Sequence, residues 1–207
     1  MANSQTATFY SARAMPPYWA VHFEVAHPPA PGAFMLVDFG GPLREPLFPA
    51  IIEARGFAAM VPPGHPATRL LPGAEVDMLG PLGRGFRFYD VTARLLLIAE
   101  AEHLPALLPL LDAAPSVTLV VEAATRAQIP PPHRFPPAVE LYLVTRDGST
   151  GYLGPLESDE PAPADLQRAA PKLRELLAWA ECVCVALDSS RYPALAAMLR
   201  EARLQPR

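Results

Sequence analysis

Cysteine is scarce in this chain of 207 residues, and its scarcity excludes two kinds of site. The only two cysteines, Cys182 and Cys184, lie two positions apart, which is poor geometry for a disulfide between them. A disulfide framework is therefore not expected. A [2Fe–2S] cluster needs four protein ligands, so we expect no iron–sulfur cluster either.

Long apolar runs and clustered positive charge are also missing. No segment approaches the roughly 20 apolar residues of a membrane span, and the first residues lack the pattern of a signal peptide. We therefore expect no membrane partner and, by default, a cytoplasmic location. The net charge is −4 with no basic stripe, which argues against nucleic acid. The histidines have no metal-ligand spacing, so no metal site is expected.

Apolar residues make up 51% of the chain, enough for a real core, and the 27 prolines punctuate it. The first part reads as short apolar segments divided by Pro/Gly turns, which predicts an N-terminal antiparallel six-stranded β-barrel. The expected strands cover residues 7–13, 19–25, 34–39, 47–52, 57–61 and 75–79.

The pattern changes after about residue 90. Compact apolar runs now predict strands covered on both faces, and helical spacing appears between them. Strands are expected at residues 95–98, 117–121, 139–144 and 182–187, and helices at residues 102–113, 165–180 and 192–204. This alternation predicts a Rossmann-like parallel sheet. We therefore expect a β-barrel domain over residues 1–90 and an α/β domain over residues 91–207.

Two glycine-containing segments carry a resemblance to a known family. Residues 80–86 read Gly-Pro-Leu-Gly-Arg-Gly-Phe, and residues 145–154 read Thr-Arg-Asp-Gly-Ser-Thr-Gly-Tyr-Leu-Gly. The first resembles the Gly-Pro-Leu-Gly-x-Gly-Phe motif of the electron-transfer subunit of type B dihydroorotate dehydrogenase. The second resembles the Thr-x-Asp-Gly-Ser-x-Gly-x-x-Gly loop of the same subunit. That subunit belongs to the ferredoxin reductase superfamily, so the resemblance implies a flavin-binding-type barrel followed by an NAD-binding-type α/β domain.

The resemblance also implies an FAD site. Arg44 stands where the family has an arginine that faces the pyrophosphate, although Phe48 takes the place of the family's hydroxyl. Thr68 matches the threonine of the family's phosphate-binding glycine turn, in which one glycine has become Ala67. The candidate cofactor-binding residues are Arg44, Pro46, Gly64, Thr68, Gly80, Gly83, Gly85, Asp147, Gly148 and Ser149. Plainer alternatives stay open: a tight turn for the three later glycines, and an Asx turn for residues 147–149.

The same comparison argues against a nicotinamide nucleotide. The family's glycine-rich turn is replaced by residues 99–103, where Glu100 and Glu102 stand in the path of a pyrophosphate. The family's Cys-Gly-Pro after the fourth strand is replaced by Leu187, Asp188 and Ser189. We therefore expect FAD as the candidate cofactor and no NAD, and we assign no catalytic residue.

Three functions remain open at this point. The first is an electron-transfer subunit that carries FAD and serves a partner oxidoreductase such as dihydroorotate dehydrogenase. The second is a non-catalytic structural or regulatory relative that has lost nucleotide binding. The third is a binder of some other small ligand. Oxidoreductase activity follows only from the first, and the expected partner is a catalytic dehydrogenase subunit or a second copy of the chain.

Overall fold

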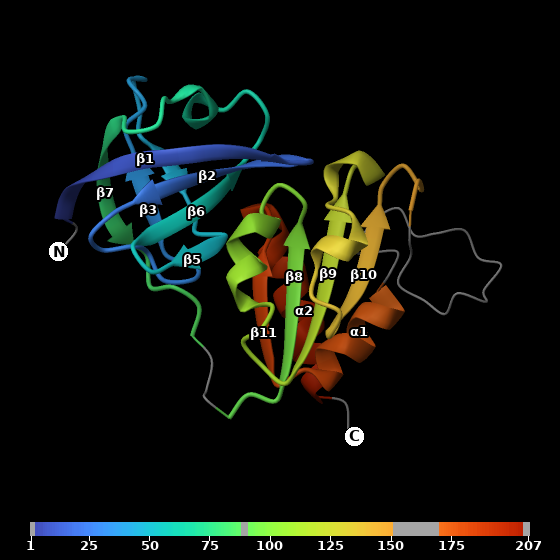
Figure 1. Cartoon of the computed structure of the whole chain (residues 1–207). Helices are drawn as coiled ribbons and strands as arrows, with labels where there is room; N and C mark the ends of the chain where they lie inside the picture. The colour runs from blue at the N-terminus through green and yellow to red at the C-terminus, as the bar shows by residue number, and fades with distance from the viewer. Residues whose placement is uncertain (1–2, 88–90, 151–169, 205–207) are drawn as a thin grey trace. The chain divides into compact units, whose positions relative to one another are not determined.

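The computed structural model of the chain describes residues 3–87, 91–150 and 170–204. It divides into two compact units, Met1–Arg87 with Pro105–Leu110 and Phe88–Leu104 with Leu111–Arg207. An antiparallel sheet forms the first unit and a parallel sheet the second, as Figure 1 shows. The predicted fold class, an antiparallel barrel-like unit followed by a Rossmann-like α/β unit, is confirmed.

The first unit is one seven-stranded antiparallel sheet with the order β4-β3-β7-β1-β2-β6-β5. No pairing joins β4 to β5 within the described residues, so this curled sheet is open rather than a closed barrel. The strands are β1 (Asn3–Met15), β2 (Tyr18–Glu24), β3 (Phe34–Val37), β4 (Glu45–Leu47), β5 (Ile51–Glu53), β6 (Gly56–Val61) and β7 (Glu75–Leu82).

The prediction of six strands was wrong, because the single strand expected at residues 47–52 is two strands. β4 pairs with β3 at one edge of the sheet, and β5 pairs with β6 at the other edge. Pro49 lies between them and has no amide hydrogen to donate to a ladder. The chain therefore leaves one edge there, and the Ala50 amide donates to the Ala58 carbonyl (2.8 Å) as the chain joins the other edge.

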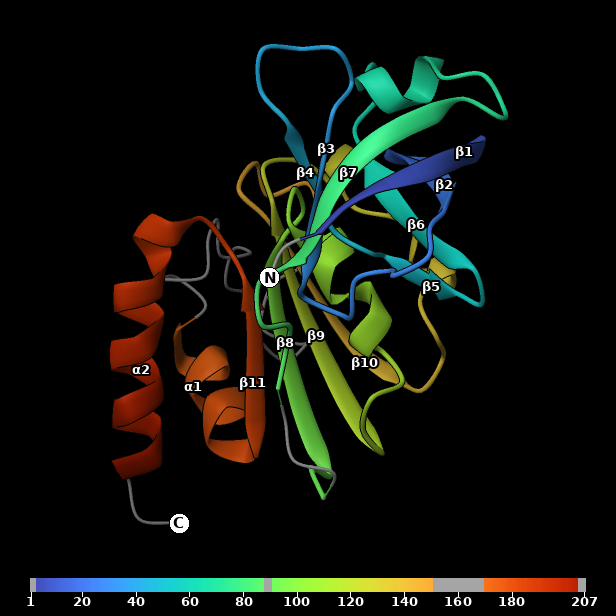
Figure 2. The same ribbon diagram turned by 90° about the vertical axis from the view of Figure 1, so that its left-hand side faces the viewer.

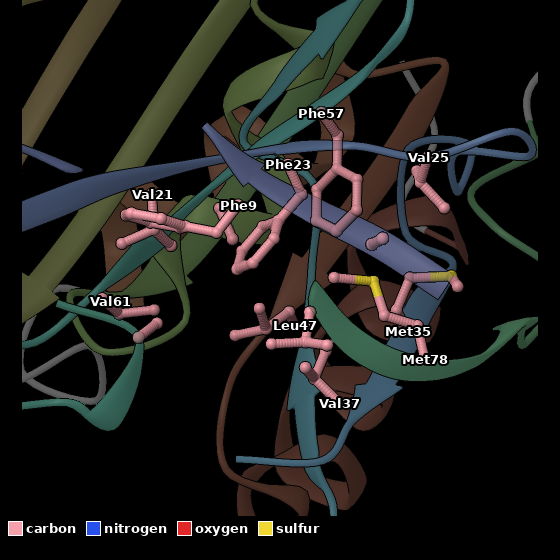
Figure 3. Close-up of a cluster of buried hydrophobic side chains, with 14 residues drawn as sticks. Phe9, Val21, Phe23, Val25, Met35, Val37, Leu47, Phe57, Val61 and Met78 are labelled. Atoms are coloured by element: carbon pink, nitrogen blue, oxygen red, sulfur yellow. The ribbon is translucent and has the colours of Figure 1, made fainter. Parts of the chain in front are cut away.

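The core of the first unit follows the two-residue period of its strands, because alternate side chains of a strand point to one face. Figure 3 shows this cluster. The Phe23 ring is at its centre, with centroid distances of 5.7 Å to the Phe9 ring and 5.9 Å to the Phe57 ring. Other fully buried members are Ala7, Val21, Met35, Val37 and Met78.

The second unit is a four-stranded parallel sheet with the order β10-β9-β8-β11. Its strands are β8 (Arg94–Glu100), β9 (Ser116–Ala123), β10 (Val139–Thr145) and β11 (Cys182–Ala186). The chain adds β9 and β10 on one side of β8, then returns to place β11 on the other side. The strand order therefore reverses between β8 and β11.

Two helices, α1 (Ala170–Trp179) and α2 (Tyr192–Leu204), cover one face of this sheet (Figure 2). Leu173 and Leu177 of α1 pack with Ile98 of β8 and Val120 of β9 in one buried cluster. The helix predicted at residues 192–204 is confirmed. The one predicted at residues 165–180 is confirmed from Ala170 onward, and its first five positions lie outside the described residues.

The helix expected at residues 102–113 is confirmed only in part. That segment forms a short 3₁₀ helix, η2 (Leu104–Leu110), with Pro109 inside it. Proline removes the amide that an α-helix needs and clashes with the preceding turn, so the apolar spacing of this segment does not become an α-helix. Of the helices in residues 3–87, 91–150 and 170–204, none is long and apolar enough to cross a membrane.

We expect Phe23→Ala to destabilise the first unit by about 3–5 kcal/mol, because it removes a fully buried ring that contacts two others. Urea unfolding followed by circular dichroism measures the change. Tyr10→Ala is the matched control, since Tyr10 on β1 is 71% exposed. An equal effect of the two substitutions would show that the Phe23 ring does not support the core.

Candidate functional site

The candidate arginine of the first unit is already paired within the chain. Arg44 precedes β4, and its Nη2 donates to Oδ2 of Asp77 on β7. The Ser4 hydroxyl donates to the other oxygen of Asp77 (2.6 Å), and these hydrogen bonds from Ser4 and Arg44 lower the pKa of Asp77. Nη1 of Arg44 is buried and has no hydrogen-bond partner among the described residues. One donor of this arginine is therefore unsatisfied although its charge is matched.

The phosphate-binding turn expected around Gly64 and Thr68 forms a 3₁₀ helix, η1 (Pro66–Arg69). Its amides bond within the turn: Ala67 N–H donates to Nδ1 of His65 (3.2 Å), and Thr68 N–H donates to the His65 carbonyl (3.0 Å). The Thr68 hydroxyl also donates to that carbonyl (2.7 Å). These three donors are therefore not free to hold a phosphate in this arrangement.

His65 ties η1 to β4. Its Nε2 lies 2.9 Å from Oε2 of Glu45, and its ring meets the Phe39 ring edge-on. Burial lowers the pKa of His65, and the attraction of Glu45 offsets only part of that shift. The neutral ring is favoured for a geometric reason too, because Nδ1 accepts from the Ala67 amide and a proton there would break this hydrogen bond.

The remaining candidates of the first unit lie on β4, on β7 and in the segment after β7. Pro46 is exposed on β4. Gly80 and Gly85 have positive φ angles and close neighbours: an added Cβ would lie 2.7 Å from Sδ of Met35 at Gly80, and 2.8 Å from the Pro31 carbonyl oxygen at Gly85. Gly83 faces the Phe34 ring at an ordinary contact distance. Packing against the chain itself therefore accounts for Gly80 and Gly85.

Asp147, Gly148 and Ser149 lie in the second unit and form a turn after β10. The Ser149 amide donates to Oδ1 of Asp147 (2.9 Å), which is an Asx turn, and hydrogen bonds from Ser149 lower the pKa of Asp147. The Ser149 hydroxyl accepts from the Arg126 amide (3.0 Å) in the loop after β9. The Ser149 hydroxyl therefore links this turn to the loop after β9.

A cluster of four charged residues, which we call the edge cluster, occupies the carboxyl ends of the parallel strands. It consists of Glu100, Glu122, Arg146 and Arg191. Residues two apart on a strand share a face, so Glu100 follows Ile98 and Glu122 follows Val120 on the face that α1 and α2 cover. Glu100 and Glu122 are direct neighbours in the pairing of β8 with β9. Two carboxylates side by side repel, so this edge needs positive charge.

Two arginines supply that charge and bridge both carboxylates. Arg191 Nη1 lies 2.6 Å from Oε1 of Glu100, and its Nη2 lies 2.7 Å from Oε2 of Glu122. Arg146 Nε lies 2.7 Å from Oε1 of Glu122, and its Nη2 lies 3.3 Å from Oε1 of Glu100. The Glu122 side chain is 0% exposed and that of Arg191 is 23% exposed. Burial opposes the charge of Arg191, but the hydrogen bonds to the two glutamates outweigh it and raise its pKa.

The loop after β11 completes the edge cluster. The Asp188 amide donates to Oε2 of Glu100 (2.7 Å), and the Asp188 carboxylate in turn accepts from the amide and hydroxyl of Ser190. His103 Nε2 lies 3.9 Å from the same Glu100 oxygen. Glu100 therefore receives donors from the turn after β10, from the loop after β11 and from the segment before α2.

Sequence reasoning singled out Glu100 but missed Glu122, Arg146 and Arg191 as its partners. A signal was present: Glu122 directly follows the apolar run at residues 119–121 of β9, and a charge inside such a strand requires a partner. Glu102 was expected to act beside Glu100, yet it is exposed and outside the edge cluster. Within the described residues, no group of three or more His, Cys, Asp or Glu side chains could hold a metal ion.

No family model matches this sequence, and no curated protein is recognisably similar to it. Solved structures are similar in fold. The ferredoxin reductase in carbazole 1,9a-dioxygenase aligns with a TM-score of 0.74 at 17% identity, over 100% of this chain and 67% of that chain. The CS-b5R domains of human Ncb5or, in the NAD⁺ form, align with a TM-score of 0.73 at 12% identity, over 99% of this chain and 68% of theirs.

Ferredoxin-NADP⁺ reductase from Plasmodium falciparum aligns with a TM-score of 0.68 at 8% identity, over 97% of this chain and 92% of that one. This is the ferredoxin reductase fold. The chain spans about two thirds of the length of the first two structures. In a ferredoxin reductase-like fold the edge cluster lies at the carboxyl edge of the parallel sheet, the edge at which open α/β sheets bind ligands.

We expect Arg191→Met to destabilise the second unit by about 3–5 kcal/mol, because it leaves the buried Glu122 without one of its two arginines. Urea unfolding gives the value. Arg200→Met, at an exposed position of α2, serves as the control. Adding Glu122→Gln to Arg191→Met should recover part of the loss, and a double mutant with no recovery would contradict the pairing.

We expect the first unit to lose stability as the pH falls from about 7.5 to 5.5, because unfolded His65 takes up a proton near its ordinary pKa while the folded one resists it. The loss starts near the unfolded pKa and ends below the folded one. His65→Asn keeps a capping oxygen and removes the titration, so its stability should vary less with pH. His27→Asn, at an exposed position, should keep the wild-type pH profile. Identical profiles for all three proteins would exclude His65 as the titrating group.

Proposed function

We propose that this chain is a ferredoxin reductase-like electron-transfer subunit that holds FAD on its first unit and exchanges electrons with a partner oxidoreductase. The observation that carries the proposal is the buried, unsatisfied Nη1 of Arg44, because a phosphate oxygen is the acceptor such a donor fits best. Structures with this fold include ferredoxin reductases that act with partner proteins, as their names indicate. The two motifs at residues 80–86 and 145–154 favour a dihydroorotate dehydrogenase-like partner.

The fit of FAD to the first unit is partial. Nη1 of Arg44 is unpaired but buried, so the side chain must move before it can reach a phosphate. An added Cβ at Gly64 has no atom within 4 Å, so a ligand has room there. The Phe34 and Phe48 rings pack at a tilt with a centroid distance of 5.2 Å, and the Phe34 ring offers apolar surface next to Gly83. When bound, FAD supplies the redox chemistry, and the task of these side chains is to hold and orient it.

NADH does not fit the second unit as the electron source. The two arginines of the edge cluster are paired with its two glutamates, so the cluster as a whole has no positive charge left over to attract a pyrophosphate. Electrons for this subunit therefore come from a protein partner in our proposal. The partner is a catalytic dehydrogenase chain, and a second copy of this chain is the alternative.

The second candidate function is a non-catalytic structural or regulatory subunit. It is favoured by the pairing of Arg44 with Asp77, which competes with a phosphate, and by the internal bonds of the amides in η1. The two candidates differ in one measurable property, which is whether the chain binds FAD.

Titration of the purified chain with FAD tests the proposal. We expect saturable binding, seen as quenched flavin fluorescence, and binding about tenfold weaker in Arg44→Met because a charge-assisted hydrogen bond is lost. Asp77→Asn should bind FAD more tightly than the wild type, since it releases Arg44 from its competing carboxylate. Arg55→Met, at a side chain that is 86% exposed, is the matched control and should bind like the wild type.

Two results decide between the candidates. If folded wild-type chain and folded Asp77→Asn both fail to bind FAD, the electron-transfer proposal is wrong and the non-catalytic function stands. If FAD binds, NADH should leave the flavin absorbance unchanged, and bleaching of the flavin by NADH would show that the second unit accepts nicotinamide after all.

A further inference from the structure

The carboxylate of Glu100 is held as a bound anion would be held. It accepts from a backbone amide at Asp188 (2.7 Å) and from guanidinium groups of Arg191 (2.6 Å) and Arg146 (3.3 Å). A loop amide combined with two arginines is a donor set that suits the oxygens of phosphate as well as those of carboxylate. The three donors come from different segments, and Glu100 is the group on which they converge.

The place of Glu100 in the topology strengthens this comparison. It ends β8, and the Asp188 amide belongs to the loop after β11, so the carboxylate lies where the strand order reverses. In open α/β sheets this crevice is where ligands bind. Here the sheet fills its own crevice with a side chain from its central strand.

The charges show what the loss of Glu100 would leave behind. Glu100 and Glu122 carry −2 and Arg146 and Arg191 carry +2, so the edge cluster is neutral. Without Glu100 the sum is +1. Glu122 keeps Nε of Arg146 and Nη2 of Arg191. Nη2 of Arg146, Nη1 of Arg191 and the Asp188 amide would then have lost their acceptor.

One of these donors, Arg191, also borders a cavity. Arg191 and Ser190 line this cavity of about 290 Å³, and its other walls are apolar side chains of α1 and α2 and Leu187 after β11. The Arg146 side chain is 53% exposed, so the edge cluster is open to solvent on that side. Two carboxylates oppose an anion here: Glu122, which bonds both arginines, and Asp188, which accepts from Ser190. His103 Nε2 lies 3.9 Å from Oε2 of Glu100.

We propose that Glu100 is an internal ligand of an anion site in the second unit, and that a diphosphate group is the external anion that this site accepts once the carboxylate is removed. The site consists of the Asp188 amide, Arg191 and Arg146. It lies within one unit and does not depend on FAD, so its test is independent of the flavin titration.

Calorimetric titration with inorganic diphosphate tests the proposal. Wild-type chain should show no saturable binding, and Glu100→Ala should bind diphosphate at least about tenfold more tightly than the wild type does. Glu102→Ala is the matched control, because it removes an exposed carboxylate two residues away that is not in the edge cluster. It should behave like the wild type. Adding Arg191→Met to Glu100→Ala should abolish the gain.

Glu100→Gln protects the test against misfolding, since it removes the charge and keeps the shape of the side chain. It should gain diphosphate affinity in the same direction as Glu100→Ala. The proposal fails if neither variant, shown to be folded by circular dichroism, binds diphosphate better than the wild type. It also fails if the gain persists without Arg191 or appears equally in Glu102→Ala, because either result would reveal general attraction to a less acidic protein.

Discussion

The carboxylate of Glu122 dictates the arrangement of the whole carboxyl edge of the parallel sheet. A charge with no exposure to water costs several kcal/mol unless it is paired and hydrogen-bonded. Arg146 and Arg191 both approach it for that reason, and each arrives from a different segment of the chain. The loop after β10 and the segment before α2 are thereby fixed to the centre of the sheet, and Glu100 balances the charge that remains.

This arrangement changes the reason for expecting no nicotinamide nucleotide. The sequence alone predicts that the charges of Glu100 and Glu102 repel a pyrophosphate. In the structure the edge cluster is neutral and Glu102 takes no part, so simple repulsion is a weak argument. The stronger argument is that the site is already occupied, because the donors that would bind a phosphate are bonded to the Glu100 and Glu122 side chains. The first unit shows a similar conflict on a smaller scale, where Asp77 competes for Arg44.

The sequence was sufficient for the two-part fold because both periodicities were clear. Alternation in residues 19–25 and compact apolar runs such as residues 117–121 reflect burial on one face and on two faces of a sheet. The sequence-based prediction of the elements failed at two prolines. Pro109 prevents an α-helix in η2. Pro49 separates β4 and β5, which lie at opposite edges of the sheet. The edge cluster was hidden because its pairs span up to 91 residues, and only the register of β8 with β9 makes Glu100 and Glu122 neighbours.

The buried position of Glu122 also sets the order in which substitutions could accumulate at this edge. Loss of either arginine first leaves an uncompensated charge inside the protein, whereas loss of Glu100 first leaves an excess positive charge that water or a dissolved anion can neutralise. Substitution of residue 100 is therefore the least destabilising first step by which evolution can create or remove this arrangement. Glu100, whose side chain is 14% exposed, is the variable partner of the edge, and the fully buried Glu122 holds the arginines in place.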